Sequence, residues 1–245
     1  MRSRPGTTLP RPVTETLQQL ESRLQEVRGR IAAAERLSGR EPGSATLIGV
    51  VKTQPGEVIA AAVQLGLHDL GENRVQEAEL HQQVVARDAA RWHMIGHLQR
   101  NKVGKALALF DFVHGIDDFE LAEALSRRAT VEQRRLPVLI EVNVSGEESK
   151  FGADPIALPG LLDQVMTLEG LEVRGLMTVG APVETSELAR PVFVRLRKLR
   201  DAAQRQLGIV LPELSMGMSG DYEVAVEEGS TLVRVGSAIF GSRQP

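Results

Sequence analysis

Lys52 is the residue whose type and position most strongly suggest covalent chemistry. The chain has five lysines, and Lys52 is the one that directly follows an apolar, strand-like run, LIGVV. Partial burial at a strand end disfavours the ammonium form, and a neutral amine can attack an aldehyde to form a Schiff base. The alternative is a strand-end lysine whose long stem reaches solvent, and position alone does not separate the two.

Two loops near the end of the sequence suit a bound anion. The loop SMGMSGDYE enters a helical stretch that Ser219 can cap, and VRVGSAIFG carries Arg234, Gly236 and Ser237. Free N–H groups at a helix N-terminus bind phosphate well. Ordinary helix capping and a strand-end glycine would explain either loop alone. The two loops together, with an arginine between them, favour a phosphate-bearing ligand.

Other features of the sequence argue against disulfides, metal sites and several kinds of catalytic nucleophile. The sequence contains no cysteine, so disulfides, thiolate zinc sites and a cysteine nucleophile are excluded. His93 and His97 are spaced H-x-x-x-H, but the zinc motif needs H-E-x-x-H on a helix, so we interpret them as hydrogen-bonding residues. No G-x-S-x-G nucleophile motif occurs. Glu72 and Asn73 fit either a loop-to-helix cap or a ligand contact.

A repeating pattern of elements must position these residues. Short apolar runs predict strands at 45–51, 68–71, 92–96, 112–116, 137–144, 172–179, 212–216 and 231–236. Helical stretches follow most of them, at 55–66, 74–88, 100–109, 118–130, 155–168, 185–206 and 219–228. This alternation predicts a (β/α)8 barrel, which carries its chemistry at the carboxyl ends of the strands. The competing architecture is a doubly wound open sheet, but its G-x-G-x-x-G turn is missing after the first strand.

The N-terminal segment predicts a tail and one extra helix. Residues 1–12 hold three prolines and three arginines, and we expect them to form a flexible tail. Thr14 can cap the helix that follows. The apolar residues of this helix recur at helical spacing: Leu17, Leu20, Leu24, Val27 and Ile31. We expect residues 13–245 to form a single barrel domain.

Composition and charge restrict the class of protein further. The 245 residues are 42% hydrophobic and 25% charged, and the net charge of −3 gives no electrostatic footprint for nucleic acid. No apolar run approaches the roughly 20 residues of a membrane span, and the N-terminus lacks the apolar core of a secretory signal. We therefore expect a cytoplasmic protein that binds neither nucleic acid nor a membrane.

Seven motifs together resemble a known family. In chain order they are VVKTQP, LGENRVQE, WHMIGHLQRNK, VNVSGEESKFG, RGLMTVG, LSMGMSGD and VRVGSAIFG. Spread over residues 45–243 in this order, they are similar to the signatures of the pyridoxal phosphate homeostasis proteins, the YggS/PROSC family. The resemblance implies a (β/α)8 barrel of the alanine-racemase type, without that enzyme's extra β-domain, that binds pyridoxal 5′-phosphate (PLP).

The resemblance also implies roles for individual residues. Lys52 is implied as the lysine that holds PLP as a covalent aldimine. Ser219, Gly236 and Ser237 are implied as phosphate ligands, and Arg234 as the residue that faces the pyridine nitrogen. Three further residues resemble family positions near the pocket: Asn73, His97 and Met177.

Two classes of function follow from this resemblance. The first is a PLP carrier that buffers the cofactor or delivers it to apo forms of PLP-dependent enzymes, without robust catalysis. The alternative is a fold-type III PLP enzyme such as an amino-acid racemase, which needs an acid–base group opposite the lysine, commonly a tyrosine. The single tyrosine, Tyr222, is predicted in a helix, and an arginine at the ring nitrogen fits carbanion chemistry poorly. We therefore expect a monomeric carrier that uses no metal.

Overall fold

The backbone closes into a barrel of parallel strands. The computed structural model describes residues 17–147, 151–181 and 183–241. Each strand pairs in parallel with the next, and β8 pairs with β1. The predicted (β/α)8 barrel is therefore confirmed, and an open sheet is excluded. The strands are β1 (Thr46–Val50), β2 (Asp69–Glu72), β3 (Arg91–Met94), β4 (Phe112–Ile116), β5 (Leu136–Glu141), β6 (Leu171–Met177), β7 (Glu213–Ser215) and β8 (Leu232–Val235).

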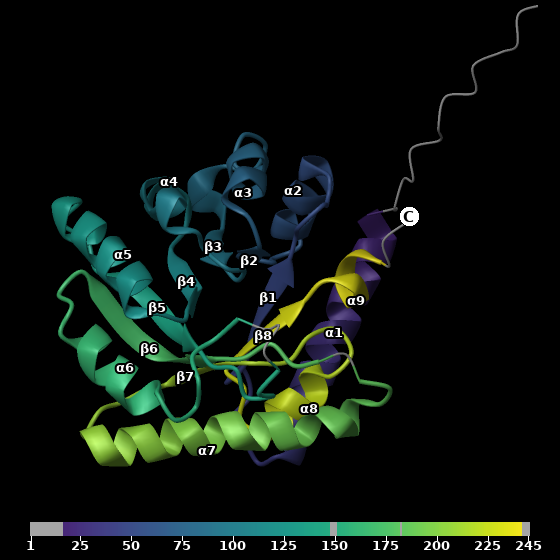
Figure 1. Ribbon diagram of the computed structural model, residues 1–245. Coiled ribbons are helices and arrows are strands. Elements are labelled where there is room, and N and C mark those ends of the chain that lie inside the picture. The colour runs from purple at the N-terminus through teal and green to yellow at the C-terminus, as the bar shows by residue number, and fades with distance from the viewer. Residues whose placement is uncertain (1–16, 148–150, 182, 242–245) are drawn as a thin grey trace, which may run out of the picture.

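Helices surround the barrel and connect its strands (Figure 1). The α-helices are α1 (Leu17–Leu37), α2 (Gly56–Gln64), α3 (Val75–His81), α4 (Val103–Leu109), α5 (Phe119–Val131), α6 (Leu158–Met166), α7 (Arg190–Leu207), α8 (Tyr222–Glu227) and α9 (Ser237–Phe240). Short 3-10 helices are η1 (Arg87–Ala89), η2 (Arg100–Lys102) and η3 (Ser186–Ala189). Within the described ranges, no helix combines the length and the apolar character needed to cross a membrane.

A small apolar cluster occupies the inside of the barrel. Side chains two residues apart on a strand share a face, so Val50 and Arg234 point the same way as Ile48 and Leu232. The side chains of Val50 and Arg234 lie one layer nearer the carboxyl ends of the strands than those of Ile48 and Leu232. A much larger apolar cluster packs between the strands and the helices. The members of the inner cluster are Ile48, Phe112, Leu139, Met177 and Leu232.

The predicted extra N-terminal helix is α1. Its buried face includes Leu20 and Leu24, and it lies beside α8 and α9 (Figure 1). Near its end, the buried Glu35 carboxylate accepts a hydrogen bond from the backbone N–H of Ala45 at 2.8 Å. This bond fixes the helix to the chain just before β1. The predicted cap at Thr14 and the predicted tail lie outside the described residues.

Helix boundaries near the site differ from the predictions. The helix α8 begins at Tyr222, so the prediction that Ser219 caps it was wrong. Asp221 holds the N-cap position instead, and its carboxylate accepts a hydrogen bond from the backbone N–H of Met218 at 2.6 Å. The helix predicted at 74–88 ends already at His81. The four-residue α9 was not predicted, because its apolar residues continue the strand-like run of β8.

Candidate functional site

A cavity of about 490 Å³ opens at the carboxyl ends of the strands. Its volume lies within the range of small-molecule pockets, about 300–1,000 Å³. The ends of β1, β2 and β8 and the loop after β7 supply its polar lining. Six of the eight residues predicted for the site line it: Lys52, Asn73, Ser219, Arg234, Gly236 and Ser237. The structure thus brings these six together, and what they bind remains a prediction.

Lys52 lies in the turn that follows β1 and is partly buried. The next residue, Thr53, has a φ of 65°, a left-handed conformation that is uncommon for a β-branched residue. Strained backbone of this kind costs roughly 1–3 kcal/mol and is concentrated at ligand sites. The positive charge of Lys52 also acts on Glu72 at the end of β2, where it opposes the effect of burial on the pKa of that carboxyl group. The turn therefore places an amine in the cavity wall beside β2.

Two backbone N–H groups converge on Ser219. Gly236 donates to the Oγ of Ser219 at 3.0 Å, and Ala238 donates to the same atom at 3.3 Å. Ser237, the first residue of α9, lies between these two donors in the sequence and also lines the cavity. An oxygen atom is thus held where the two N–H groups point. A phosphate oxygen would suit the same donors, because charge-assisted hydrogen bonds are stronger than neutral ones.

Arg234 places a buried cation in the cavity wall. Its side chain donates from Nη1 to the Oγ of Ser215 at 2.5 Å and from Nη2 to the carbonyl oxygen of Thr178 at 2.8 Å. Burial lowers the pKa of Arg234 to about 10, although Glu141 and Asp221 oppose this change. The guanidinium therefore keeps its charge at neutral pH. Since a guanidinium donates and never accepts, Arg234 suits an acceptor atom of a ligand.

Two of the predicted residues do not line the cavity. Met177 ends β6 and is fully buried in the inner apolar cluster. The ring of His97 stacks on the ring of Phe151, with centroids 4.1 Å apart, and its Nδ1 lies 3.6 Å from Asp117. Both residues sit at or just after a strand end, as the motifs predicted, but their side chains have other neighbours. Sequence position gave no means of deciding this.

The histidines spaced H-x-x-x-H do not form a metal site. His93 is buried inside the barrel, and its ring nitrogens lie 3.0 Å from His114 and 3.0 Å from Asp69. His97 is on the loop after β3, against Phe151. Across the described residues, no group of three or more His, Cys, Asp or Glu side chains could hold a metal ion. The hydrogen-bonding interpretation of His93 therefore agrees with its contacts.

Sequence reasoning missed a buried acid–base pair at the edge of the site. Glu72 ends β2 with its side chain fully buried, and its Oε1 lies 2.5 Å from the Nδ1 of His81 on α3. Burial and then the neighbouring Glu77 raise the pKa of Glu72 to about 8, and burial lowers the pKa of His81. Both changes in pKa favour the arrangement in which the glutamic acid holds the proton and donates it to a neutral imidazole. The N-cap of α3 is Arg74, so Glu72 does not cap the helix.

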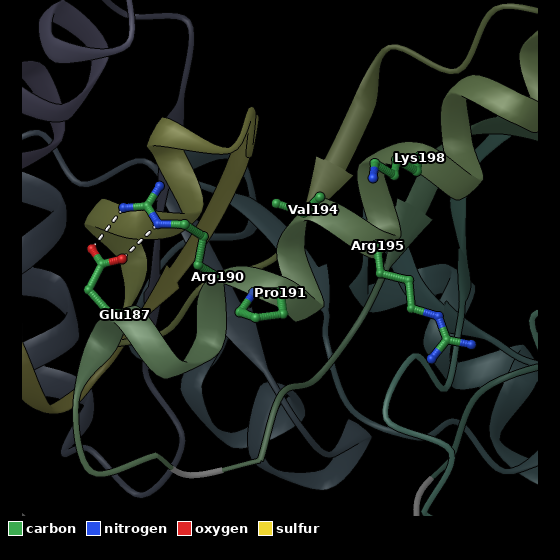
Figure 2. A pocket seen from close by; sticks show the side chains of 6 residues that line it. All are labelled: Glu187, Arg190, Pro191, Val194, Arg195 and Lys198. Carbon is green, nitrogen blue, oxygen red and sulfur yellow. Dashed lines mark hydrogen bonds and ion pairs between the residues drawn. The ribbon is translucent and has the colours of Figure 1, made fainter.

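A second, open pocket of about 460 Å³ lies on the outside of α7. Figure 2 shows Arg190 turned toward Glu187, and these side chains form an ion pair with an N–O distance of 2.7 Å. Arg190 also pairs with Glu227 and Glu228. Three carboxylates thus already neutralise the charge of this arginine. The residues that line it are Glu187, Arg190, Pro191, Val194, Arg195 and Lys198.

Comparison with known proteins gives a matching family and close relatives. The family model "Alanine racemase, N-terminal domain" matches residues 22–244. A "Pyridoxal phosphate homeostasis protein" from Aquifex aeolicus (strain VF5) is 43% identical over 222 residues, which cover 91% of this chain and 97% of the relative.

Solved structures show the same barrel. PipY of Synechococcus elongatus PCC7942, solved with PLP bound, is 35% identical with a TM-score of 0.80, and the match covers 91% of this chain and 100% of PipY. Alanine racemase of Clostridium difficile 630, in complex with cycloserine, has a TM-score of 0.73 at 14% identity. That match covers 94% of this chain and 61% of the racemase, and at this identity it shows a shared fold alone.

Proposed function

This chain belongs to the alanine racemase N-terminal domain family and, within it, to the pyridoxal phosphate homeostasis proteins, and we propose that it binds PLP and serves the homeostasis of that cofactor. One observation carries the proposal: a lysine, a buried arginine and two loops with converging backbone N–H groups line a single cavity. PLP carries an aldehyde, a pyridine nitrogen and a phosphate. These three groups match the three features of the cavity.

In this proposal, Ser219, Gly236 and Ser237 hold the phosphate. The backbone N–H groups of Gly236 and Ala238 already point at one oxygen atom, the Oγ of Ser219. A dianion would receive charge-assisted hydrogen bonds from these donors and from the serine hydroxyls. The phosphate would therefore supply much of the affinity for the cofactor.

Lys52 and Arg234 are proposed to hold the other two groups. The Nζ of Lys52 would hold the aldehyde carbon of PLP, since a neutral amine binds an aldehyde covalently with loss of water. Arg234 donates a hydrogen bond to the pyridine nitrogen and keeps it unprotonated. Bound PLP supplies an electron sink, and an unprotonated ring nitrogen makes that sink weak. Asn73, just after β2, lines the cavity and would contact the cofactor, whereas His97 and Met177 lie outside the cavity lining.

The wider role is part of the same proposal. A single barrel domain, residues 13–245, acts as a cytoplasmic monomer and passes PLP to apo forms of PLP-dependent enzymes. The support for a carrier is that Lys52 and Arg234 line the cavity together with the loops proposed to hold the phosphate. Tyr222, the single tyrosine of the chain, is not among the described residues of that lining. A metal ion has no part in this role.

The proposal is tested by trapping the covalent bond. Purified protein is incubated with PLP and reduced with borohydride, and the modified residue is located by peptide mass spectrometry. We expect the label on Lys52, its loss in Lys52→Ala, and its retention in Lys105→Ala, a control whose lysine pairs with Glu79 on the surface. Full labelling of another lysine in Lys52→Ala would contradict the assignment. Failure of the wild-type protein to bind PLP would contradict the function.

A further inference from the structure

A continuous chain of hydrogen bonds crosses the inside of the barrel. It starts at Asp69, the first residue of β2, and ends at Arg234 in the cavity wall. The distances are 3.0 Å from Asp69 Oδ1 to His93 Nε2, 3.0 Å from His93 Nδ1 to His114 Nε2, 3.0 Å from His114 Nδ1 to Ser215 Oγ, and 2.5 Å from Ser215 Oγ to Arg234 Nη1. The two histidines and Ser215 are fully buried, and Arg234 is 4% exposed.

When both histidines are neutral, the two ends of this chain fix the direction of every hydrogen bond in it. A guanidinium donates and never accepts, so Ser215 receives a proton from Arg234 and passes its own to the Nδ1 of His114. An ionised carboxylate accepts and never donates, so His93 donates from Nε2 to Asp69. His114 must then donate from Nε2 to the Nδ1 of His93. Burial lowers the pKa of both histidines, so each neutral ring carries one N–H, and these bonds place it on Nε2 in both.

The chain is an unusual filling for a barrel interior. Branched apolar side chains usually fill the layers inside a (β/α)8 barrel. Here the ring of Phe112 packs against both histidines, with centroids 5.6 Å from His93 and 4.7 Å from His114. A buried polar network is costly unless every member is bonded, and apolar residues of similar shape serve stability as well or better. This network therefore points to a role at the site where it ends.

That role concerns the buried charge of Arg234. Within the described parts of the chain, the guanidinium of Arg234 makes no ion pair with a carboxylate. It donates hydrogen bonds to the hydroxyl of Ser215 and to the backbone carbonyl of Thr178. Bonds that donate in one direction polarise one another. The negative charge of Asp69, which borders a separate pocket at the far end of the barrel, therefore makes the Ser215 oxygen a better acceptor.

We propose that Asp69, His93, His114 and Ser215 form a positioning relay that holds the guanidinium of Arg234 toward the ring nitrogen of the cofactor. The inference rests on the proposed function, because it assigns Arg234 to that nitrogen. His114 and Ser215 are positioning residues, since they act through Arg234. The relay links cofactor affinity and the electronic state of the ring to a carboxylate at the opposite end of the barrel.

The first test removes the link between the histidines and Arg234. Ser215→Ala is expected to raise the Kd for PLP about tenfold and to shift the visible absorbance and circular dichroism of the bound cofactor. Ser215→Thr, which keeps the hydroxyl, is expected to restore both. Ser230→Ala is the matched control, because the Ser230 hydroxyl is equally buried beside β7 and β8 but donates to backbone carbonyls. It should leave the affinity and the spectrum unchanged.

The second test acts on the far end of the chain of hydrogen bonds, and it includes one measurement on the cofactor-free protein. Asp69→Asn is expected to shift the absorbance spectrum of the bound cofactor in the same direction as Ser215→Ala, but by a smaller amount. The control is Glu172→Gln, which alters a carboxylate near the start of β6 that pairs with Arg174 and should leave the spectrum unchanged. Nitrogen-15 NMR of the cofactor-free protein should report Nε2–H tautomers for His93 and His114.

The outcomes separate the relay from the proposed function. A Ser215→Ala protein that matches Ser230→Ala in affinity and spectrum, while wild type binds PLP, overturns the relay alone. Nδ1–H tautomers in the cofactor-free protein also overturn it, because the bonds would then run the other way. Failure of the wild-type protein to bind PLP overturns the proposed function and, with it, the role of Arg234 at the ring.

Discussion

The hydroxyl oxygen of Ser219 accepts a hydrogen bond from the backbone N–H of Gly236 at 3.0 Å, so one serine joins the loop after β7 to the turn after β8. Ala238 donates to the same oxygen at 3.3 Å. A bound phosphate must either replace this oxygen or share its donors. Anion binding and the geometry of the two loops are therefore coupled at Ser219.

Ser219→Ala is expected to weaken PLP binding by about 10- to 100-fold, since a hydrogen bond to a charged group contributes roughly 1.5–3 kcal/mol. Pyridoxal, which lacks the phosphate, should bind the variant and the wild-type protein with similar, weak affinity. Equilibrium titration measures both. Ser126→Ala is the control, because the Ser126 hydroxyl also accepts from a glycine N–H, that of Gly170 at 3.1 Å, away from the cavity. An equal loss for PLP and pyridoxal would contradict the phosphate assignment.

The buried Glu72–His81 pair predicts a pH dependence of stability. The pKa of Glu72 in the folded protein, about 8, lies above the ordinary value of 4.5. Between these values, the folded protein binds one more proton than the unfolded chain. The free energy of unfolding therefore falls as the pH rises through this window, by up to about 1.4 kcal/mol per pH unit. Glu141, whose pKa burial raises to about 7, adds a slope of the same sign at lower pH.

Glu72→Gln is expected to reduce this slope between pH 7 and pH 8, where the imidazole of His81 is largely neutral in both states. The amide keeps a donor for the Nδ1 of His81, so the variant should fold. Urea unfolding at the two pH values measures the effect. Glu79→Gln, which alters an exposed carboxylate paired with Lys105, should retain the wild-type slope. A wild-type stability that does not fall over this interval would count against the raised pKa.

Gly175 is expected to tolerate no larger residue. It pairs with Glu213 across β6 and β7, and a Cβ at Gly175 would collide with the carbonyl oxygen of Glu213. Gly175→Ala should therefore separate the two strands and lower the free energy of unfolding by about 3 kcal/mol or more. Gly29→Ala, inside α1 with nothing near the added methyl group, should raise stability by up to about 1 kcal/mol. Chemical denaturation measures the free energy of unfolding of both variants. Equal values for Gly175→Ala and Gly29→Ala would contradict this explanation.

The barrel and most of its site could be predicted because each rests on a repeated or local signal. Apolar runs alternating with helical stretches predict the strand order, and the barrel then brings all carboxyl strand ends to one face. Lys52 and Arg234 therefore meet in one cavity although they are far apart in the sequence. Helix starts were less predictable, since Ser219 and Asp221 both suit an N-cap and the folded loop selects Asp221.

The polar contacts inside the fold could not be predicted in this way. His114 and Ser215 are 101 positions apart, and neither carries a motif that marks it as a partner of the other. Glu72 and His81 meet because α3 folds back on β2, which depends on packing rather than on local pattern. The stacking of His97 on Phe151 likewise depends on where the loop after β5 lies.

Tyr222 packs on the outside of the barrel, against α1, and is not available as a second acid–base group. Its side chain is buried, and the guanidinium of Arg30 lies 5.7 Å from its ring centroid. It is not among the described residues that line the cavity. Since Tyr222 is the single tyrosine of the chain, the tyrosine that a two-base racemase commonly uses has no counterpart at the cavity.

We therefore expect negligible racemisation of alanine and serine, together with measurable transfer of PLP to an apo-enzyme. A positioned acid–base group typically contributes about a hundredfold to ten-thousandfold to proton transfer. In the proposed site, Arg234 would leave the ring nitrogen unprotonated, and such a ring withdraws electrons weakly. A stereospecific amino-acid assay and reactivation of an apo PLP-dependent enzyme, each run with wild type and Lys52→Ala, measure the two activities. Racemase turnover near the enzyme median of about 10 per second, lost in Lys52→Ala, would replace the carrier by the racemase alternative.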